Sequence, residues 1–386
     1  MRNWRLLLVV ILAFVADCSF SQTIDTAKSE KSNPIQLPEW IHNMVYDTAS
    51  STKPRFLFYP VVGYAPETKW EFGLSGLVVF HYKNDTTLRL SEISAFAFYT
   101  QERQLGLWID HVTYGKDNNF LTLGKMRFQN YPLYFYGVGS EIPKDPVAVV
   151  NANYYSVRER FLYRITGNLF AGLQLDYQEL GSTNWENLDL SRPVNTFPKG
   201  ADGSRNFGLG AGIVLDSRHN MLNVRDGYMA EIAVLHYGDV SYNQFPMTTL
   251  FLDGRYFLPT SKNQVLAFQV VGQFSKGDVP FNQLSLMGGE TIMRGYYSGR
   301  YRDKNYVAAQ AEYRFLPFIS GTRLGGAVFG SVGAVSNGNF PQNNYKWSAG
   351  AGLRYLLFPK KDIFTRIDFG FNPDGYGVYF YIGEAF

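Results

Sequence analysis

Apolar and polar residues alternate with a period of two in one segment after another from residue 55 to the end of the chain. This period is typical of β-strands, because successive side chains of a strand point to opposite faces of its sheet. In the segment 308–315, Gln310, Glu312 and Arg314 share one face, whereas alanine, tyrosine and phenylalanine occupy the other. The pattern therefore predicts strands with one polar and one apolar face.

The charges on the polar face indicate what that face contacts. In the segment 366–371, Arg366 and Asp368 alternate with Ile367 and Phe369. Such charges cannot fill the dry core of a soluble sandwich, but they can line the wet interior of a barrel whose outer face contacts lipid. We therefore expect an all-β fold, an antiparallel transmembrane β-barrel.

The alternation predicts sixteen strands in this barrel. They are expected near residues 57–65, 69–82, 88–100, 104–115, 119–129, 151–165, 168–181, 206–216, 227–238, 247–258, 264–275, 304–315, 322–335, 346–358, 363–372 and 376–386. An even number of strands places both ends of the barrel at the same rim.

The connections between these strands differ in length. Short ones are predicted at 83–87, 116–118, 166–167, 259–263, 316–321 and 359–362, and long ones at 130–150, 182–205 and 276–303. Outer-membrane barrels have short periplasmic turns and long extracellular loops. We therefore expect the segments 182–205 and 276–303 to lie outside the cell.

Residues 1–21 have the composition of a secretory signal, with a basic start, an apolar run too short to cross a bilayer, and small residues before Gln22. The alternative is a lipoprotein signal that ends at Cys18, although Asp17 stands where such a signal carries a small residue. We expect residues 22–54 to form a periplasmic tail and residues 55–386 to form the barrel.

Composition supports a membrane barrel and excludes other classes. Aromatic residues make up 17% of the chain, which suits the aromatic girdles at the two membrane interfaces. Cys18 is the single cysteine, so the mature chain is expected to carry no disulfide and no cysteine chemistry. The net charge of +3 gives no sign of a nucleic-acid partner.

The titratable residues form no recognisable catalytic or metal site. The five histidines lack the spacing of a metal-ligand pair. Asp110 and His111 resemble a protease dyad, but adjacent residues of a strand face opposite ways and cannot act together. We therefore expect no enzymatic activity, no cofactor and no metal.

The longest predicted loop carries the most specific motif. Its key residues are Gly288, Gly289, Arg294, Gly295 and Tyr296. A guanidinium is permanently charged and has five donors, so inside a lumen it needs carboxylates or carbonyls. Glycines allow the backbone to fold tightly around it. The alternative is an ordinary extracellular loop with a solvated arginine.

This motif, followed by Ala-Glu-Tyr-Arg-Phe at 311–315, closely resembles the barrel of the BamA/TamA superfamily of outer-membrane assembly factors, the bacterial surface antigen family. In that family an Arg-Gly-aromatic tip on the sixth extracellular loop folds back into the lumen, and five strands follow it. The segments 60–68, 134–139, 215–227 and 381–386 resemble other family motifs and occur in the family order.

The chain departs from the family pattern in two places. The family's Phe-x-Asp-x-Gly, whose Asp pairs with the loop arginine, is here Phe329-Gly-Ser331-Val-Gly. Strand parity then offers Glu312 or Asp368 as the lumen partner of Arg294. The family also carries periplasmic polypeptide-transport (POTRA) domains, and residues 22–54 are too few for one, so the chain resembles a short branch without them.

The resemblance implies a protein that assists the insertion or translocation of other outer-membrane or surface proteins. Its expected partners are outer-membrane lipid, unfolded outer-membrane clients and a periplasmic or outer-membrane assembly partner. A client strand would add at a seam between the first and last strands, where Pro60 lacks an N–H. Parity places Phe386 and Glu384 on the lipid side. A passive pore or structural barrel is the alternative.

Overall fold

The computed structural model describes residues 54–65, 69–101, 103–187, 197–318, 322–340, 344–359 and 362–386. These residues all belong to one compact unit of the chain. The predicted signal at 1–21 and almost all of the predicted tail at 22–54 lie outside the described residues. No helix in the described part of the chain is long and apolar enough to cross a membrane.

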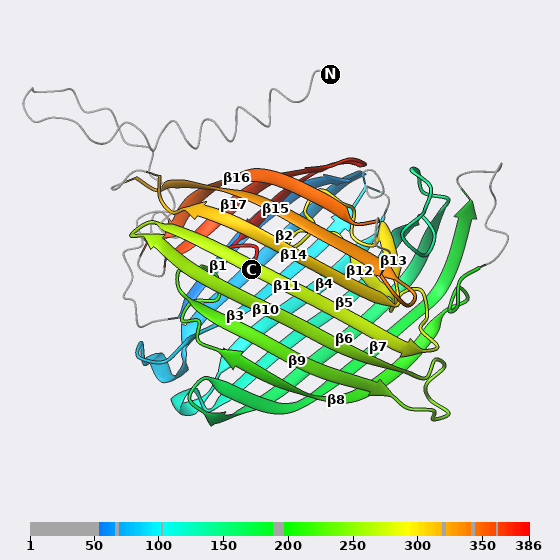
Figure 1. Ribbon diagram of the computed structural model, residues 1–386, viewed down its shortest axis with the longest axis horizontal. Helices are drawn as coiled ribbons and strands as arrows, with labels where there is room; N and C mark the ends of the chain where they lie inside the picture. Colours follow the sequence, from blue (N-terminus) through cyan, green and yellow to red (C-terminus); the bar gives the residue numbers. More distant parts are fainter. Residues whose placement is uncertain are drawn as a thin grey trace, which may run out of the picture. The chain divides into compact units, whose positions relative to one another are not determined.

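One antiparallel sheet of sixteen strands dominates the structure (Figure 1). Each strand pairs with the next along the chain, except that β11 pairs with β14. The strands are β1 (Arg55–Ala65), β2 (Lys69–His81), β3 (Leu90–Thr100), β4 (Leu105–Tyr114), β5 (Phe120–Phe135), β6 (Ala148–Thr166), β7 (Leu169–Asn187), β8 (Ser204–Asp216), β9 (Gly227–Tyr237), β10 (Met247–Ser261), β11 (Gln264–Gly277), β14 (Asn305–Phe315), β15 (Leu324–Ser336), β16 (Lys346–Phe358), β17 (Ile363–Asn372) and β18 (Gly375–Ile382). This confirms the predicted all-β class and the predicted order of strands.

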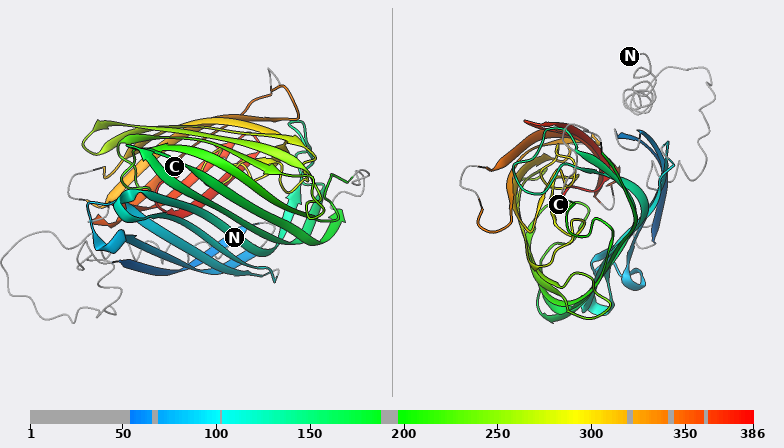
Figure 2. Two further views of the ribbon diagram at one scale, coloured as in Figure 1. Left: turned by 90° about the horizontal axis from the view of Figure 1, so that it is seen from below. Right: turned by 90° about the vertical axis from the view of Figure 1, so that its right-hand side faces the viewer.

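The two faces of the sheet differ as the alternation predicts. On β9, Ile232 and Val234 are 57% and 42% exposed, whereas Glu231 and Leu235 are buried. Exposed apolar side chains on one face and buried charged ones on the other are the reverse of a soluble sandwich. The sheet curves into a ring (Figure 2). The face with the buried charged side chains, such as Glu231, is the inner face of this ring.

The connections at the two ends of the ring differ in length. One end, here called the short-turn end, has connections such as the two residues 167–168 between β6 and β7. The other, the long-loop end, has the connections 136–147, 188–203 and 278–304. The first residues of β1 and the last of β18 lie at the short-turn end, because Leu57 and Ile382 share an apolar cluster with Phe358 and Ile363 beside the β16–β17 turn.

Some predicted strand ends were wrong. The predicted loop 130–150 is shortened to 136–147, because β5 and β6 stay paired from Asn130 opposite Asn153 up to Phe135 opposite Ala148. The predicted loop 182–205 likewise loses its first residues to β7, where Asn184 pairs with Asn151. Alternation between apolar and polar residues stops where the lipid-facing part of a strand ends, but main-chain pairing continues beyond it.

The edges of the sheet are β1 and β18. Among the pairings of the described residues, β1 pairs with β2 and β18 with β17, and none joins β1 to β18. Their lipid-facing side chains are apolar: Phe56 and Phe58 on β1 are 66% and 58% exposed, and Val378 on β18 is 63% exposed.

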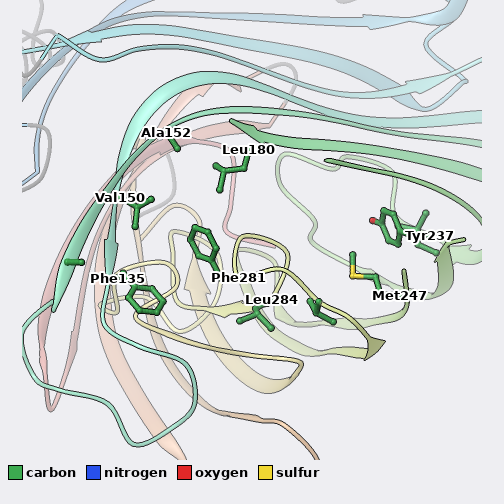
Figure 3. Close-up of a cluster of buried hydrophobic side chains, with 11 residues drawn as sticks. Phe135, Val150, Ala152, Leu180, Tyr237, Met247, Phe281 and Leu284 are labelled. Atoms are coloured by element: carbon green, nitrogen blue, oxygen red, sulfur yellow. The ribbon is translucent and has the colours of Figure 1, made fainter. Parts of the chain in front are cut away.

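The long connection 278–304 enters the ring and fills part of it. It carries a short hairpin of β12 (Ser285–Met287) and β13 (Tyr301–Asp303), which the alternation did not predict. Phe281 and Leu284 pack against inward side chains of the wall, including Phe135, Leu180 and Tyr237 (Figure 3). The fold thus places an apolar plug inside the ring, and this plug carries the arginine motif.

Candidate functional site

The hairpin β12–β13 holds a compact turn that brings Arg294 to the barrel wall. Gly288 has φ +104°, and a Cβ there would lie 2.8 Å from the main-chain oxygens of Tyr296 and Tyr297. Gly295 has φ +109° and its N–H donates to the Tyr379 hydroxyl at 2.9 Å. Left-handed backbone and such close approach both favour glycine. Gly289, φ +126°, donates its N–H to the Tyr296 oxygen at 3.2 Å.

Arg294 lies wholly inside the ring, with no exposed surface. Its guanidinium donates to Asp368 Oδ2 at 2.7 Å and to the Glu312 carboxylate. The guanidinium carbon lies 3.4 Å from the centre of the Phe329 ring. The loop arginine therefore bridges two carboxylates and stacks on an aromatic face, which uses both its planar donors and its π surface.

Three further arginines share these carboxylates. Arg314 Nε lies 2.7 Å from Glu312, Arg354 contacts Asp368 and Glu384, and Arg366 contacts Asp368. We call the seven residues Arg294, Arg314, Arg354, Arg366, Glu312, Asp368 and Glu384 the arginine cluster. Their side chains are at most 2% exposed. A buried network of this kind is stable only while every charge keeps its partners.

Two glycines make room for the cluster, and neither was predicted as a site residue. A Cβ at Gly370 of β17 would lie 2.6 Å from the Arg294 oxygen. A Cβ at Gly352 of β16 would collide with the Asp368 and Arg354 side chains. Any larger residue at either position would displace the loop or the ion pairs, so these glycines belong to the site.

Tyr296 fixes the other side of the loop tip. It is 2% exposed, and its hydroxyl donates to the Trp347 oxygen at 3.2 Å. It packs in one apolar cluster with Met293, Tyr306 and Val335. The tip therefore contacts the inner wall through an aromatic residue as well as through charge.

A second polar contact ties the base of the loop to the β17–β18 turn. Arg300 Nε lies 3.1 Å from Asp374, and the Tyr301 hydroxyl donates to the same carboxylate at 2.7 Å. Burial and this hydrogen bond to Asp374 raise the pKa of Tyr301 to about 12. The tyrosine stays protonated at neutral pH and keeps its donor role.

Ser331 does not reach Arg294. Its hydroxyl pairs with the Ser348 hydroxyl at 2.7 Å on the neighbouring strand. Both carboxylates that parity offered, Glu312 and Asp368, contact the arginine together, where the sequence suggested one or the other. The arginine thus keeps two anionic partners without an aspartate at position 331.

The predicted orientation of the chain's last residues was wrong. Phe386 is 4% exposed and packs against Phe257 with ring centres 6.0 Å apart. Glu384 joins the arginine cluster rather than the lipid face. The strand ends at Ile382, and Gly383 with φ +88° turns the tail inward. Figure 2 places the C-terminus within the ring of strands.

Pro60, the residue predicted to weaken the seam, lies within β1 opposite Leu74 of β2. Its side chain is exposed on the outer face. A proline cannot donate to a strand ladder, and it is tolerated mainly on edge strands. Its position on β1 agrees with that rule.

Asp110 and His111 face opposite sides of the sheet. Arg127 contacts Asp110 through two hydrogen bonds of 2.6 and 2.9 Å on the inner face. His111 contacts Glu159 on the outer face. Within the described residues, no group of three or more His, Cys, Asp or Glu side chains could hold a metal ion.

The arrangement defines an outer-membrane barrel with a charged loop tip anchored in its lumen. A model of the Omp85 superfamily domain matches residues 122–386. The chain belongs to the Omp85 superfamily. No curated protein matches its sequence.

Two solved structures of this type resemble the chain in fold. BamA from Haemophilus ducreyi lacking POTRA domains 1–3 is 16% identical, with a TM-score of 0.52 over 85% of this chain and 69% of that one. CdiB from Acinetobacter baumannii is 11% identical, with a TM-score of 0.52 over 85% of this chain and 59% of that one. Superfamily membership places the chain in the outer membrane, among proteins of insertion or translocation rather than enzymes.

Proposed function

We propose that the chain assists the insertion or translocation of other outer-membrane or surface proteins through a seam between β1 and β18. The observation that carries this proposal is the lack of main-chain pairing between these two strands in the described residues. Unpaired N–H and C=O groups are costly in lipid, where water cannot satisfy them. A client strand that adds to either edge would satisfy them by β-augmentation.

The position of the short turns indicates which end of the seam faces the periplasm. Short turns of outer-membrane barrels face the periplasm, so we infer that the start of β1 and the end of β18 lie there. Leu57 and Ile382 share an apolar cluster at that end. Side-chain packing rather than a strand ladder then holds the seam together, and such packing can be broken and remade.

The proposed clients are unfolded outer-membrane polypeptides, supplied by a periplasmic or outer-membrane assembly partner. A passive pore is the alternative, and the loop segment 278–304 argues against it. Phe281 and Leu284 are buried against the wall, and Arg294 is fixed by two carboxylates. A barrel with a plugged lumen is compatible with insertion of a client through the lateral seam, but it is a poor channel for conduction along its axis.

Depletion of the protein followed by quantitative mass spectrometry of the outer membrane tests the proposal. We expect a defined set of barrel or surface proteins to fall several-fold while their transcripts stay constant. The purified protein should show little ion conductance in planar bilayers. An unchanged outer-membrane proteome together with steady conductance would contradict the proposal and favour the pore.

A further inference from the structure

The connection between β8 and β9 contains the Asp-Ser-Arg motif and is longer than its neighbours at the short-turn end. Arg218 and Asp216 form two side-chain hydrogen bonds of 2.9 and 3.0 Å, and their side chains are 3% and 2% exposed. Burial alone would lower the pKa of Arg218, but the Asp216 carboxylate raises it above its ordinary value. A charged pair this buried shows that the connection folds inward and does not project into solvent.

The far half of this connection reaches strands well away from its own. Arg225 donates to both oxygens of Asp362 at 2.5 and 2.7 Å and to the Leu316 oxygen at 2.9 Å. Asn223 donates to Asp362 at 2.9 Å. Asp362 precedes β17 and Leu316 follows β14, whereas β8 and β9 lie several strands away in the sheet order. Figure 1 shows β14 and β17 on one side of the ring and β8 and β9 on the other.

The C-terminal tail lies against the same connection. The Glu384 N–H donates to the Leu222 oxygen at 2.8 Å. Val224 packs with Phe257 and Phe386 in one apolar cluster. The connection is therefore held by charge at Asp362 and by main-chain and apolar contacts at the tail.

Other turns of the short-turn end also contact the start of this connection. Arg89, just before β3, donates to the Asp216 oxygen at 2.6 Å and to the Asn168 side chain at 2.9 Å. The Tyr114 hydroxyl lies 3.5 Å from the Met221 sulfur. Residues 217–226 thus contact the β14–β15 and β16–β17 turns and the tail, and Asp216, which precedes them, contacts the β2–β3 and β6–β7 turns.

We propose that residues 217–226 form a strap across the short-turn end that closes the lumen there, and that Asp362 is the contact that must break for it to open. Because Arg225 and Asp362 are 29% and 37% exposed, the pair is accessible and can break without unfolding the wall. The strap controls access to the lumen along its axis, whereas the seam proposed above opens sideways into lipid. The two adjoin, because Leu222 of the strap packs in the same apolar cluster as Leu57 and Ile382.

Labelling of a lumen cysteine tests the strap. Lys125 lies on the inner face of β5 opposite Asp110 and Arg158. A Lys125→Cys chain in phospholipid vesicles is treated with a polyethylene-glycol maleimide, and a chain with native Lys125 shows the background. Asp362→Ala and Arg225→Ala should each raise the labelling rate about fivefold, the upper range for a partly exposed ion pair.

Two further variants serve as controls: a charge swap of the Arg225–Asp362 pair, and removal of an exposed ion pair at the long-loop end. Arg225→Asp with Asp362→Arg should return the rate to within twofold of the parent. Asp278→Ala removes the exposed partner of Lys199 at the long-loop end and should leave the rate unchanged. Folding is checked by heat-modifiable migration of each chain. The strap proposal would be contradicted by any of three results. These are equal labelling rates in the parent and Asp362→Ala chains, no recovery in the charge swap, or an equal rise in rate with Asp278→Ala.

Discussion

Arg294 is the residue on which the position of the sixth loop depends most directly. Its charge is buried, and its partners Glu312 and Asp368 are also shared by Arg314, Arg354 and Arg366. Removing Arg294 leaves the carboxylates with other cations, whereas removing Glu312 leaves several guanidiniums with fewer anions. The two changes therefore carry different costs.

Arg294→Ala should release the loop tip while the wall stays folded. We expect segment 288–299 to become sensitive to added protease in intact cells, with about 1–3 kcal/mol of coupling to Glu312→Gln in a double-mutant cycle. Arg294→Lys should restore little, since one ammonium cannot reach both carboxylates as a planar fork does. Lys199→Ala, in an exposed pair, is the control. A protease-resistant loop in the Arg294→Ala chain would contradict the assignment.

The sequence predicted the two carboxylate partners because strand parity fixes which side each residue faces. Parity gives no distance across the lumen, so it could not show that Glu312 and Asp368 contact Arg294 together. It also could not single out Gly370 or Gly352. A glycine's importance depends on what lies opposite it in space, and that depends on loop placement.

Among the strands, the outer wall of β4–β6 carries an unusual polar contact. His111 and Glu159 face outward and lie 3.1 Å apart, with side chains 17% and 14% exposed. Gly124 on β5 lies between them, and a Cβ there would be 2.5 Å from Glu159. Glu159 lies midway along β6 between the outward Tyr155 and Tyr163, which are 41% and 51% exposed. The pair therefore sits within the lipid-facing band.

His111→Leu should destabilise the barrel because it leaves the Glu159 carboxylate in that band without its partner. We expect the free energy of unfolding to fall by about 1–3 kcal/mol. The double change His111→Leu with Glu159→Leu should recover to within about 1 kcal/mol of the parent. Urea unfolding in phospholipid vesicles measures both, with Val157→Leu as the control. A double variant as unstable as the single would contradict this reading.

The C-terminal strand shows where alternation stops being a guide. Extending the parity of β18 to Phe386 placed the tail on the lipid side, but Gly383 ends the strand and turns the tail inward. Glu384 then joins Arg354 instead of facing lipid. A single glycine in the left-handed conformation turns the residues after it into the lumen. The alternation of period two does not predict this turn, because it assigns sides only while the strand continues.

For the whole molecule, the order of strands could be predicted because each strand pairs with its neighbour in sequence. The inward path of segment 278–304 could be predicted only from its resemblance to a family. Its hairpin β12–β13 could not be predicted from alternation, because three-residue strands are too short to show a period. The lack of pairing between β1 and β18 could not be predicted either, because the residues of one strand do not show whether it pairs with the other.

Surface labelling tests the orientation of the barrel. Asp85 lies in the β2–β3 connection at the short-turn end, and Asp278 lies at the long-loop end. In intact cells an impermeant maleimide should label Asp278→Cys and leave Asp85→Cys unmodified, and both should react after permeabilisation. The opposite pattern in intact cells would reverse the assigned orientation.

Locking the seam tests the central claim most directly. A chain with Leu57→Cys and Ile382→Cys is oxidised, reconstituted in vesicles and supplied with an unfolded outer-membrane barrel as client. The matched control joins Thr249→Cys to Ser275→Cys, whose native hydroxyls lie 3.0 Å apart on the already paired strands β10 and β11. We predict that the seam lock abolishes accelerated client folding, that reductant restores it, and that the control lock has no effect. Full acceleration by the oxidised seam-locked chain would contradict the account.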